Sequence, residues 1–134
     1  MRKPGRIATV AVAAGALFAL NQGSALAIEA GCWTNDGDPG GKSCRIYHQG
    51  PGNIRVDMVR FMSYGEQLTL SDYAANGEGV MAIVNGEKYY WSGGAGTGTT
   101  FNLSFAEGTR VTLTSCQTRS DRDPYDCHTE QAVA

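Results

Sequence analysis

Apolar and polar residues alternate along much of this chain, and the alternation predicts β-strands. The clearest case is 100–105, where Phe101, Leu103 and Phe105 are separated by polar residues. A period of two buries one face of a strand and leaves the other face in water. Segments of this kind recur between clusters of Gly, Asn and Asp at intervals of about 8–12 residues, which is typical of an all-β fold. The sequence predicts seven strands: 43–49, 53–62, 67–72, 79–85, 87–92, 100–105 and 109–117.

These strands are expected to form a single antiparallel β-sandwich, with a small closed barrel as the alternative. The run from Val80 to Val84 is continuously apolar, as in a strand buried on both faces. Asn85-Gly86 follows this run and predicts a tight hairpin, because both central positions of a type I′ turn take a positive φ. The β-sandwich domain is expected to span residues 43–134. Residues 28–42 are rich in turn formers and predict an irregular N-terminal arm.

The first 27 residues have the pattern of a secretory signal peptide. Three basic residues stand among the first six, an apolar run follows from residue 7 to 20, and Ala25-Leu26-Ala27 offers a small-x-small cleavage site. The apolar run has about 14 residues, fewer than the roughly 20 that a membrane-spanning helix needs. We therefore expect a secreted, extracellular protein whose mature chain begins near Ile28.

Charge and length indicate how many domains the chain forms and which kinds of partner it is not expected to bind. The full chain carries 11 Lys+Arg and 13 Asp+Glu. Removing residues 1–27 takes three basic residues away, so the remaining 107 residues have eight basic and 13 acidic side chains, a net charge of −5 with both histidines neutral. About 107 residues suit one domain. Nucleic acids and anionic membranes are usually bound by a basic face, so we expect neither of them as a partner.

All four cysteines lie after the signal peptide, and an even count in a secreted chain predicts two disulfides. Four cysteines allow three pairings. We favour Cys32–Cys44 and Cys116–Cys127, because each pairing closes a short loop near one end of the chain, where fraying is otherwise greatest. Loops of this size each add about 2–3 kcal/mol of stability. The spacings are too wide for a zinc knuckle, so no metal is expected at the cysteines.

The two histidines do not lie in a recognisable catalytic motif, and no catalytic residue is assigned. A dyad of His48 with Asp57 is conceivable in space, because such pairs do not reveal themselves by sequence spacing. A surface histidine at the end of a strand is the simpler interpretation. We therefore expect a protein that is not an enzyme and needs no cofactor.

Two groups of acidic residues offer oxygen ligands of the kind that calcium prefers. Asp36 and Asp38 lie in a Gly-rich stretch, and Asp121, Asp123 and Asp126 lie close together inside the second cysteine loop. Neither group follows the EF-hand spacing. Arginines are interleaved with the second group, which is more typical of a solvated turn than of a buried acid, so no metal site is assigned.

Aromatic residues are the best candidates for binding. In Tyr89-Tyr90-Trp91, strand alternation places Tyr89 and Trp91 on one face and Tyr90 on the other. At least one of the three rings is therefore expected to point away from the core. The alternative to a binding role for Tyr89 and Trp91 is that both are simply core residues. Trp33, beside Cys32, either covers the first disulfide or anchors a partner, because Tyr and Trp are enriched at interfaces.

The segment from Leu68 to Cys127 carries a series of turn and core motifs. These are Leu68-Thr69-Leu70-Ser71-Asp72, Asn76-Gly77-Glu78-Gly79-Val80, Asn85-Gly86, Trp91, Gly96-Thr97-Gly98, Phe105-Ala106-Glu107-Gly108-Thr109 and Cys116. The pattern resembles small secreted disulfide-bonded β proteins of actinobacteria, most of which have no assigned role. Some proteins of this type are similar to the adaptor subunit of umbrella toxin particles, in which a small domain with an extended arm joins a lectin-like subunit to a large toxin chain. The predicted arm, 28–42, supplies that comparison, and no residue's role is carried over.

Three classes of function follow from these features. The favoured class is an adaptor or interaction domain that binds another secreted protein, as a subunit of an extracellular toxin assembly would. The second class is an inhibitor of a secreted hydrolase, an amylase or a protease, acting through the aromatic hairpin 89–91; the Trp-Arg-Tyr triplet of amylase inhibitors is absent. The third class is a glycan or cell-wall binding module that stacks Trp33, Tyr90 and Trp91 on sugars.

Overall fold

The computed structural model describes residues 26–35 and 37–134, and the regular structure in this part of the chain is almost entirely β-strand. A short 3-10 helix, η1 (Pro51–Asn53), connects the second and third strands. The strands are β1 (Ala27–Asn35), β2 (Asp38–Gln49), β3 (Arg55–Met62), β4 (Gln67–Asp72), β5 (Gly79–Val84), β6 (Glu87–Trp91), β7 (Thr97–Asn102), β8 (Arg110–Thr118) and β9 (Pro124–Val133).

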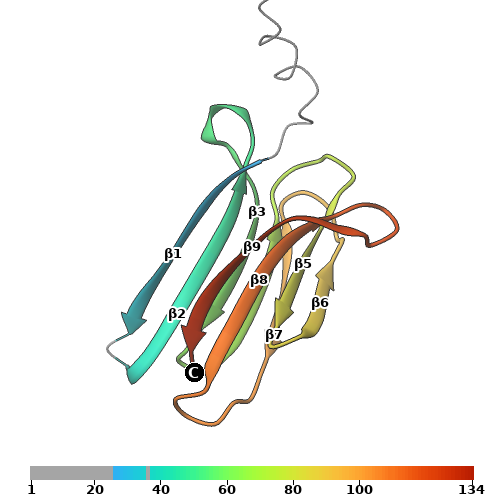
Figure 1. Cartoon of the computed structure of the whole chain (residues 1–134). Coiled ribbons are helices and arrows are strands. Elements are labelled where there is room, and N and C mark those ends of the chain that lie inside the picture. Colours follow the sequence, from blue (N-terminus) through green and yellow to red (C-terminus); the bar gives the residue numbers. More distant parts are fainter. Residues whose placement is uncertain (1–25, 36) are drawn as a thin grey trace, which may run out of the picture.

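These nine strands form one sheet, in which every pair is antiparallel. The hydrogen-bonded order is β6-β5-β8-β9-β2-β3-β4-β7, and β1 pairs with β2 outside this path. Only one residue pair, Lys42 with Val133, joins β2 to β9. The two end strands approach each other, because the ring of Tyr89 on β6 lies 5.0 Å from that of Phe101 on β7. The sheet is therefore curled into a nearly closed barrel, with β1 at its outer edge (Figure 1).

Side chains that alternate along the strands fill the inside of this curled sheet. Leu68 and Leu70 on β4 are fully buried, whereas Thr69 between them is partly exposed. On β5 every residue except Ile83 is buried, as its continuous apolar run predicted. The buried apolar cluster consists of Cys44, Ile46, Val59, Phe61, Leu68, Leu70, Val80, Ala82, Val84, Val111, Leu113, Ala132 and Ala134.

Several expectations from the sequence are confirmed. The fold is all-β, and both disulfides have the favoured pairing, Cys32–Cys44 and Cys116–Cys127. Each disulfide crosses between the two strands of a hairpin, the first from β1 to β2 and the second from β8 to β9. The predicted turn at Asn85-Gly86 connects β5 to β6 with positive φ angles of 49° and 86°.

Several expectations about the architecture are wrong. The described part of the chain has nine strands rather than seven, and they form one curled sheet rather than a clear two-sheet sandwich, so the barrel alternative is the nearer description. Residues 28–42 are not an irregular arm, because they form most of β1 and the first part of β2. The segment 124–133, which includes part of the expected solvated turn, is β9. The strand expected at 100–105 lies earlier, at Thr97–Asn102.

The structure supports part of the expectation that the protein is secreted and extracellular. Two disulfides indicate an oxidising, extracellular type of environment. Among the described residues, no helix is long and apolar enough to cross a membrane. Of the predicted signal peptide, residues 1–25 lie outside the described part of the chain, and β1 begins at Ala27, the last residue before the predicted cleavage point.

Candidate interaction surface

A stack of arginine and aromatic side chains lies on the outer face of strands β1, β2 and β3. The guanidinium of Arg45 on β2 lies 5.5 Å from the ring centre of Trp33 on β1 and 5.0 Å from that of Tyr47 on β2. The guanidinium of Arg55 on β3 lies 3.8 Å from the same tyrosine ring. These distances are typical of cation–π contacts. Rings and cations therefore alternate across three strands in the order Trp33, Arg45, Tyr47, Arg55.

Strand alternation explains why these residues share a face. Arg45 and Tyr47 are two positions apart on β2, and Ile46 between them points into the core with no exposed surface. The register places Gly31 of β1 opposite Arg45, so no β1 side chain blocks the guanidinium at that position. Tyr47 is on the outer face yet only 6% exposed, because the two arginines cover its ring.

Glu29 on β1 holds one end of the stack in place. Its carboxylate accepts hydrogen bonds from Nη2 of Arg55 at 3.0 Å and from Nε of Arg55 at 3.3 Å. Nε2 of Gln49 donates to the same carboxylate at 2.6 Å. The hydrogen bond from Arg55 to Glu29 also raises the pKa of this guanidinium, which therefore keeps its charge. The contact orients Arg55 across the face of Tyr47.

An exposed tyrosine extends the surface. Tyr73, which follows β4, is 45% exposed, and its hydroxyl lies 3.8 Å from the sulfur of Met58. Met58 pairs with Tyr47 across β2 and β3, and so lies on the same outer face. We call the set of Trp33, Arg45, Tyr47, Arg55 and Tyr73 the arginine–aromatic face.

Trp33 was a predicted binding residue, and it belongs to this face. It is half-buried against Arg45. Because neighbouring residues of a strand point to opposite faces, Trp33 lies on the side of β1 away from the Cys32 sulfur, so it does not cover the disulfide. The other predicted residues, Tyr89, Tyr90 and Trp91, lie on β6 at one end of the strand path, whereas β1 lies outside this path, beyond β2.

The three aromatic residues of β6 divide as alternation predicted. Tyr89 and Trp91 are partly buried and pack against the core, and Nε1 of Trp91 donates to the hydroxyl of Thr97 at 3.1 Å. Tyr90 lies on the opposite face, where the guanidinium of Arg122 is 4.4 Å from its ring centre. This hairpin therefore presents one ring, already covered by an arginine, rather than a row of three.

A buried polar network lies inside the fold. His48 has no exposed surface, so the expectation of a surface histidine is wrong, and its partner is Asp57 as the conceivable dyad supposed. Nδ1 of His48 lies 2.7 Å from Oδ1 of Asp57. Nε2 of His48 contacts the backbone carbonyl of Asp126 on β9. Because a carbonyl can only accept, Nε2 carries a proton. With both ring nitrogens engaged and buried, the imidazole has no free position for a substrate.

The charge of His48 follows from these contacts. Burial lowers the pKa of His48, but the hydrogen bond and charge of Asp57 and the Asp126 carbonyl outweigh it, so the pKa is raised above 6.5. Gln117 on β8 donates to the other oxygen of Asp57 at 2.6 Å. The hydroxyl of Tyr125 on β9 donates to the carboxylate of Glu78 and lies 3.3 Å from Oε1 of Gln117. The network thus ties β2 and β3 to β8 and β9.

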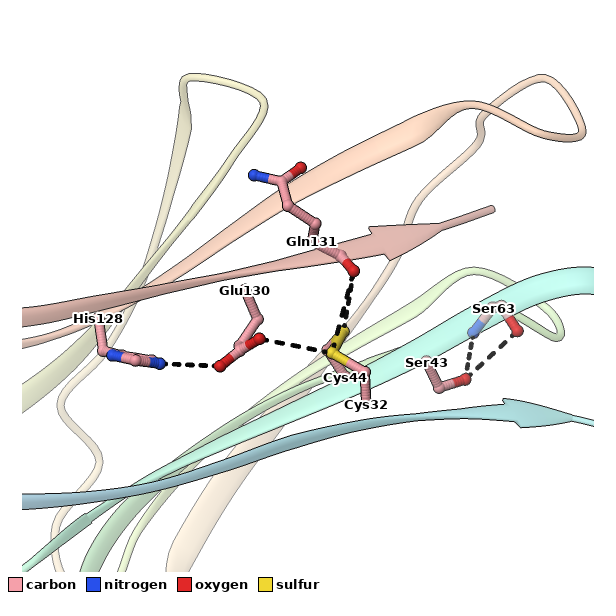
Figure 2. Close-up of a disulfide and its surroundings, with 7 residues drawn as sticks. All are labelled: Cys32, Ser43, Cys44, Ser63, His128, Glu130 and Gln131. Carbon is pink, nitrogen blue, oxygen red and sulfur yellow. Dashed lines mark hydrogen bonds and ion pairs between the residues drawn. A yellow bond between two sulfur atoms is a disulfide. The ribbon is translucent and has the colours of Figure 1, made fainter.

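The first disulfide lies near the same boundary between β2 and β9. Figure 2 shows the Cys32–Cys44 bond below Gln131 of β9, with Glu130 and His128 directed toward it. The carbonyl of Gln131 is 3.4 Å from the Cys44 sulfur, and Oε2 of Glu130 is 3.7 Å from the Cys32 sulfur. Disulfide sulfurs have no proton, so these are polar contacts rather than hydrogen bonds. Together with the single Lys42–Val133 pair and His48, they form what we call the β2/β9 seam.

The acidic groups considered for calcium do not form a metal site in the described part of the chain. Within it, no group of three or more His, Cys, Asp or Glu residues is arranged to hold a metal ion. Asp36 lies outside the described residues. Asp123 pairs with Arg119 at 3.1 Å, and Asp121 accepts the backbone N–H of Asp123, as in a solvated turn.

Comparison of the chain with protein-family models, with curated proteins and with solved structures finds no match. Function is therefore argued from the geometry alone.

Sequence reasoning missed Arg45, Tyr47 and Arg55. The signal for the first two was present, because they alternate with Ile46 and His48 in a segment predicted as a strand. Only one of the two phases can face the core, so an Arg and a Tyr in the other phase mark an outer face. Arg55 joins them through the pairing of β2 with β3, which the sequence does not reveal.

Proposed function

We propose that this protein is a secreted, non-enzymatic interaction domain that binds another secreted protein through the arginine–aromatic face. The observation that carries the proposal is the Tyr47 ring covered by Arg45 and Arg55 on the outside of the sheet. Trp, Tyr and Arg are the residues that most often dominate binding energy at protein interfaces.

The contacts of the face also indicate the chemistry of the partner. Within the described residues Arg45 makes no ion pair, and its guanidinium contacts only rings. A carboxylate on the partner would fit this unpaired charge, and the flat rings of Trp33 and Tyr73 would take apolar or planar groups beside it. The cation–π contacts and Glu29 hold the side chains in place before binding, which lowers the entropic cost of association.

The proposal no longer depends on an N-terminal arm. Residues 28–42, which supplied the comparison with umbrella-toxin adaptors, are paired strands. A role in a toxin assembly would require that this face, rather than an arm, contact the other subunits. The buried, doubly engaged imidazole of His48 is consistent with a structural role for the most polar cluster of the fold.

The test is capture of a partner from the producer's culture supernatant with tagged protein, comparing Arg45→Glu with a matched control, Arg110→Glu. Both arginines are exposed, and Arg110 lies on β8, away from the face. We expect a stoichiometric partner that is retained by Arg110→Glu and bound about 30-fold or more weakly by Arg45→Glu, as for a hot-spot residue.

Two outcomes would contradict the proposal. A partner bound equally well by wild type and Arg45→Glu would remove the face from the interface. A partner lost in Tyr90→Ala but retained by Arg45→Glu would move binding to the β6 hairpin and favour a hydrolase inhibitor or a glycan-binding module. The second outcome is checked against a panel of amylases and proteases and a panel of polysaccharides.

A further inference from the structure

Strand β1 is a long edge strand with one side open. It pairs with β2 over its whole length, and no strand in the described part of the chain pairs with its other side. Figure 1 shows β1 at the outer edge of the sheet. Some backbone N–H and C=O groups of β1 therefore point away from β2, toward the open side.

Two observations show which residues face the open side. The Cα atoms of Cys32 and Cys44 are 4.1 Å apart, a distance typical of a non-hydrogen-bonded antiparallel pair. In addition, the backbone N–H of His48 donates to the side-chain Oδ1 of Asp57 on β3, so the even-numbered residues of β2 turn their backbone groups toward β3 and not toward β1. The even-numbered residues of β1 must then turn theirs away from β2. These residues are Ile28, Ala30, Cys32 and Thr34.

Proteins usually protect an open edge, and β6, at one end of the strand path, is protected. β6 has only five residues and begins with the charged pair Glu87-Lys88. On β9, the carbonyl of Asp126 accepts a hydrogen bond from His48, and the carbonyl of Gln131 contacts the disulfide. By contrast, β1 has nine residues and no Lys or Pro. Its one charge, Glu29, is bound to Arg55. An edge without such protection is suited to pairing with another strand.

We propose that β1 is a self-association edge, which pairs in antiparallel fashion with β1 of a second copy of this chain around a two-fold axis at Gly31. The proposal goes beyond the interaction function above and does not rest on it, since it uses the backbone of β1 rather than the side chains of the arginine–aromatic face. The product would be one continuous sheet formed from two protomers.

The register follows from the four free residues. Only a register in which Ile28 meets Thr34 of the second copy, and Ala30 meets its Cys32, places all four residues in hydrogen-bonded pairs. This register makes about eight hydrogen bonds across the two-fold axis. It also places Gly31 opposite Gly31 of the second copy as a non-hydrogen-bonded pair, in which the two Cα atoms lie close together. A Cβ atom at Gly31 would have no neighbour within 4 Å, so the outer face of the sheet is uncrowded at this position.

The side chains of β1 are compatible with this register. Glu29 faces Trp33 of the second copy, so no like charges are opposed. An edge of nine residues buries less than the roughly 1,000 Å² that a stable interface needs, so the dimer is expected to be weak, in about the micromolar to millimolar range. It would place two arginine–aromatic faces on one sheet, and a partner with two sites would then bind by avidity.

The test uses the secreted protein and two substitutions at one residue, Ala30→Pro and Ala30→Val. Proline removes the outward N–H of residue 30 without removing a hydrogen bond between β1 and β2, and proline is tolerated on an edge strand in that orientation. Valine keeps the N–H and suits a strand. Sedimentation velocity from about 10 μM to 1 mM follows the mass, and circular dichroism confirms that each variant folds.

We expect wild type and Ala30→Val to approach twice the monomer mass as concentration rises, while Ala30→Pro stays monomeric. Hydrogen exchange should show concentration-dependent protection of the amides of Ala30, Cys32 and Thr34, with the amides of Gly31 and Trp33 protected at every concentration. A wild type that stays monomeric at 1 mM, or an Ala30→Pro variant that still dimerises, would overturn the proposal. Arg45→Glu should dimerise normally, which separates this result from the test of partner binding.

Discussion

The two disulfide-linked hairpins, β1–β2 and β8–β9, have the same local construction but different surroundings. Each has a cross-strand disulfide with a sequence separation of 12 or 11 residues. The outer side of β9 meets the β2/β9 seam, where His48 binds the Asp126 carbonyl. The outer side of β1 meets no strand in the described part of the chain. A hairpin of the same design therefore has strands on both sides in one case and forms an edge of the sheet in the other.

Ion pairs show the same contrast. In the network that supports the β2/β9 seam, His48 and Asp57 form a buried pair whose side chains are 0% and 3% exposed. On the outer face, Glu29 of β1 and Arg55 of β3 form a pair whose side chains are 43% and 44% exposed. Burial makes a broken pair costly, whereas water and counter-ions replace much of an exposed pair. The first pair is expected to control folding, and the second to organise the arginine–aromatic face.

Removing one member of each ion pair should give the largest difference in the free energy of unfolding between the two regions. Asp57→Ala leaves His48 and the Gln117 amide buried without their acceptor, and we expect a loss of about 3–5 kcal/mol in the free energy of unfolding. Glu29→Ala should cost less than about 1 kcal/mol. Urea unfolding of both variants measures the difference. Equal losses would show that the buried pair is no more important for folding than the exposed one.

The disulfides should give the next largest effect. Replacing either cysteine pair by two alanines removes a constraint worth about 3 kcal/mol for loops of this length. The location of the damage should differ. Without Cys32–Cys44, β1 is held by the β2 ladder and by side-chain contacts such as Glu29–Arg55, so its amides should exchange faster than those of the rest of the sheet. Without Cys116–Cys127, contacts of His48 and Tyr125 still hold β9, so its amides should remain protected.

Hydrogen exchange measured residue by residue checks this prediction, with the wild type as the reference. Equal protection of β1 and β9 after loss of their own disulfides would contradict it, because the seam would then contribute nothing to holding β9.

Much of the sheet was predictable from the sequence, and the missing parts have a common cause. Strands 67–72 and 79–84 contain Leu and Val in clear patterns, and both were found. β1 and β9 were missed because neither has a clear alternation of large apolar and polar residues. In β9, Glu130 and His128 point toward the disulfide in positions where an apolar pattern would place core residues (Figure 2). Disulfides and polar contacts replace apolar burial in these strands, and alternation analysis does not detect such contacts.

The candidate site was less predictable. Trp33 was selected from its isolated position beside Cys32, but Arg45 lies 12 positions further along the chain and meets it only through strand pairing. Arg55 lies 22 positions after Trp33 and joins the same face through its contact with Tyr47. The His48–Asp57 contact was conceivable from the sequence, whereas the burial of His48 was not. The burial of His48 depends on β9, because the Asp126 carbonyl of this strand contacts the imidazole. The sequence did not predict β9 as a strand.

The smallest expected effect is a dependence of stability on pH, and it should belong to the seam alone. The pKa of His48 is raised in the folded protein above its ordinary 6.5. Folding therefore gains stability from the protonated imidazole below about pH 6.5, and this gain is lost as pH rises through the folded-state value. Thermal unfolding should show a melting temperature that falls across this range in wild type and in Glu29→Ala. His48→Gln should lack this part of the dependence, although it is less stable throughout. A melting temperature that falls equally in His48→Gln would place the titrating group outside the seam, and a nuclear magnetic resonance titration of the His48 imidazole in the folded protein would show the same independently.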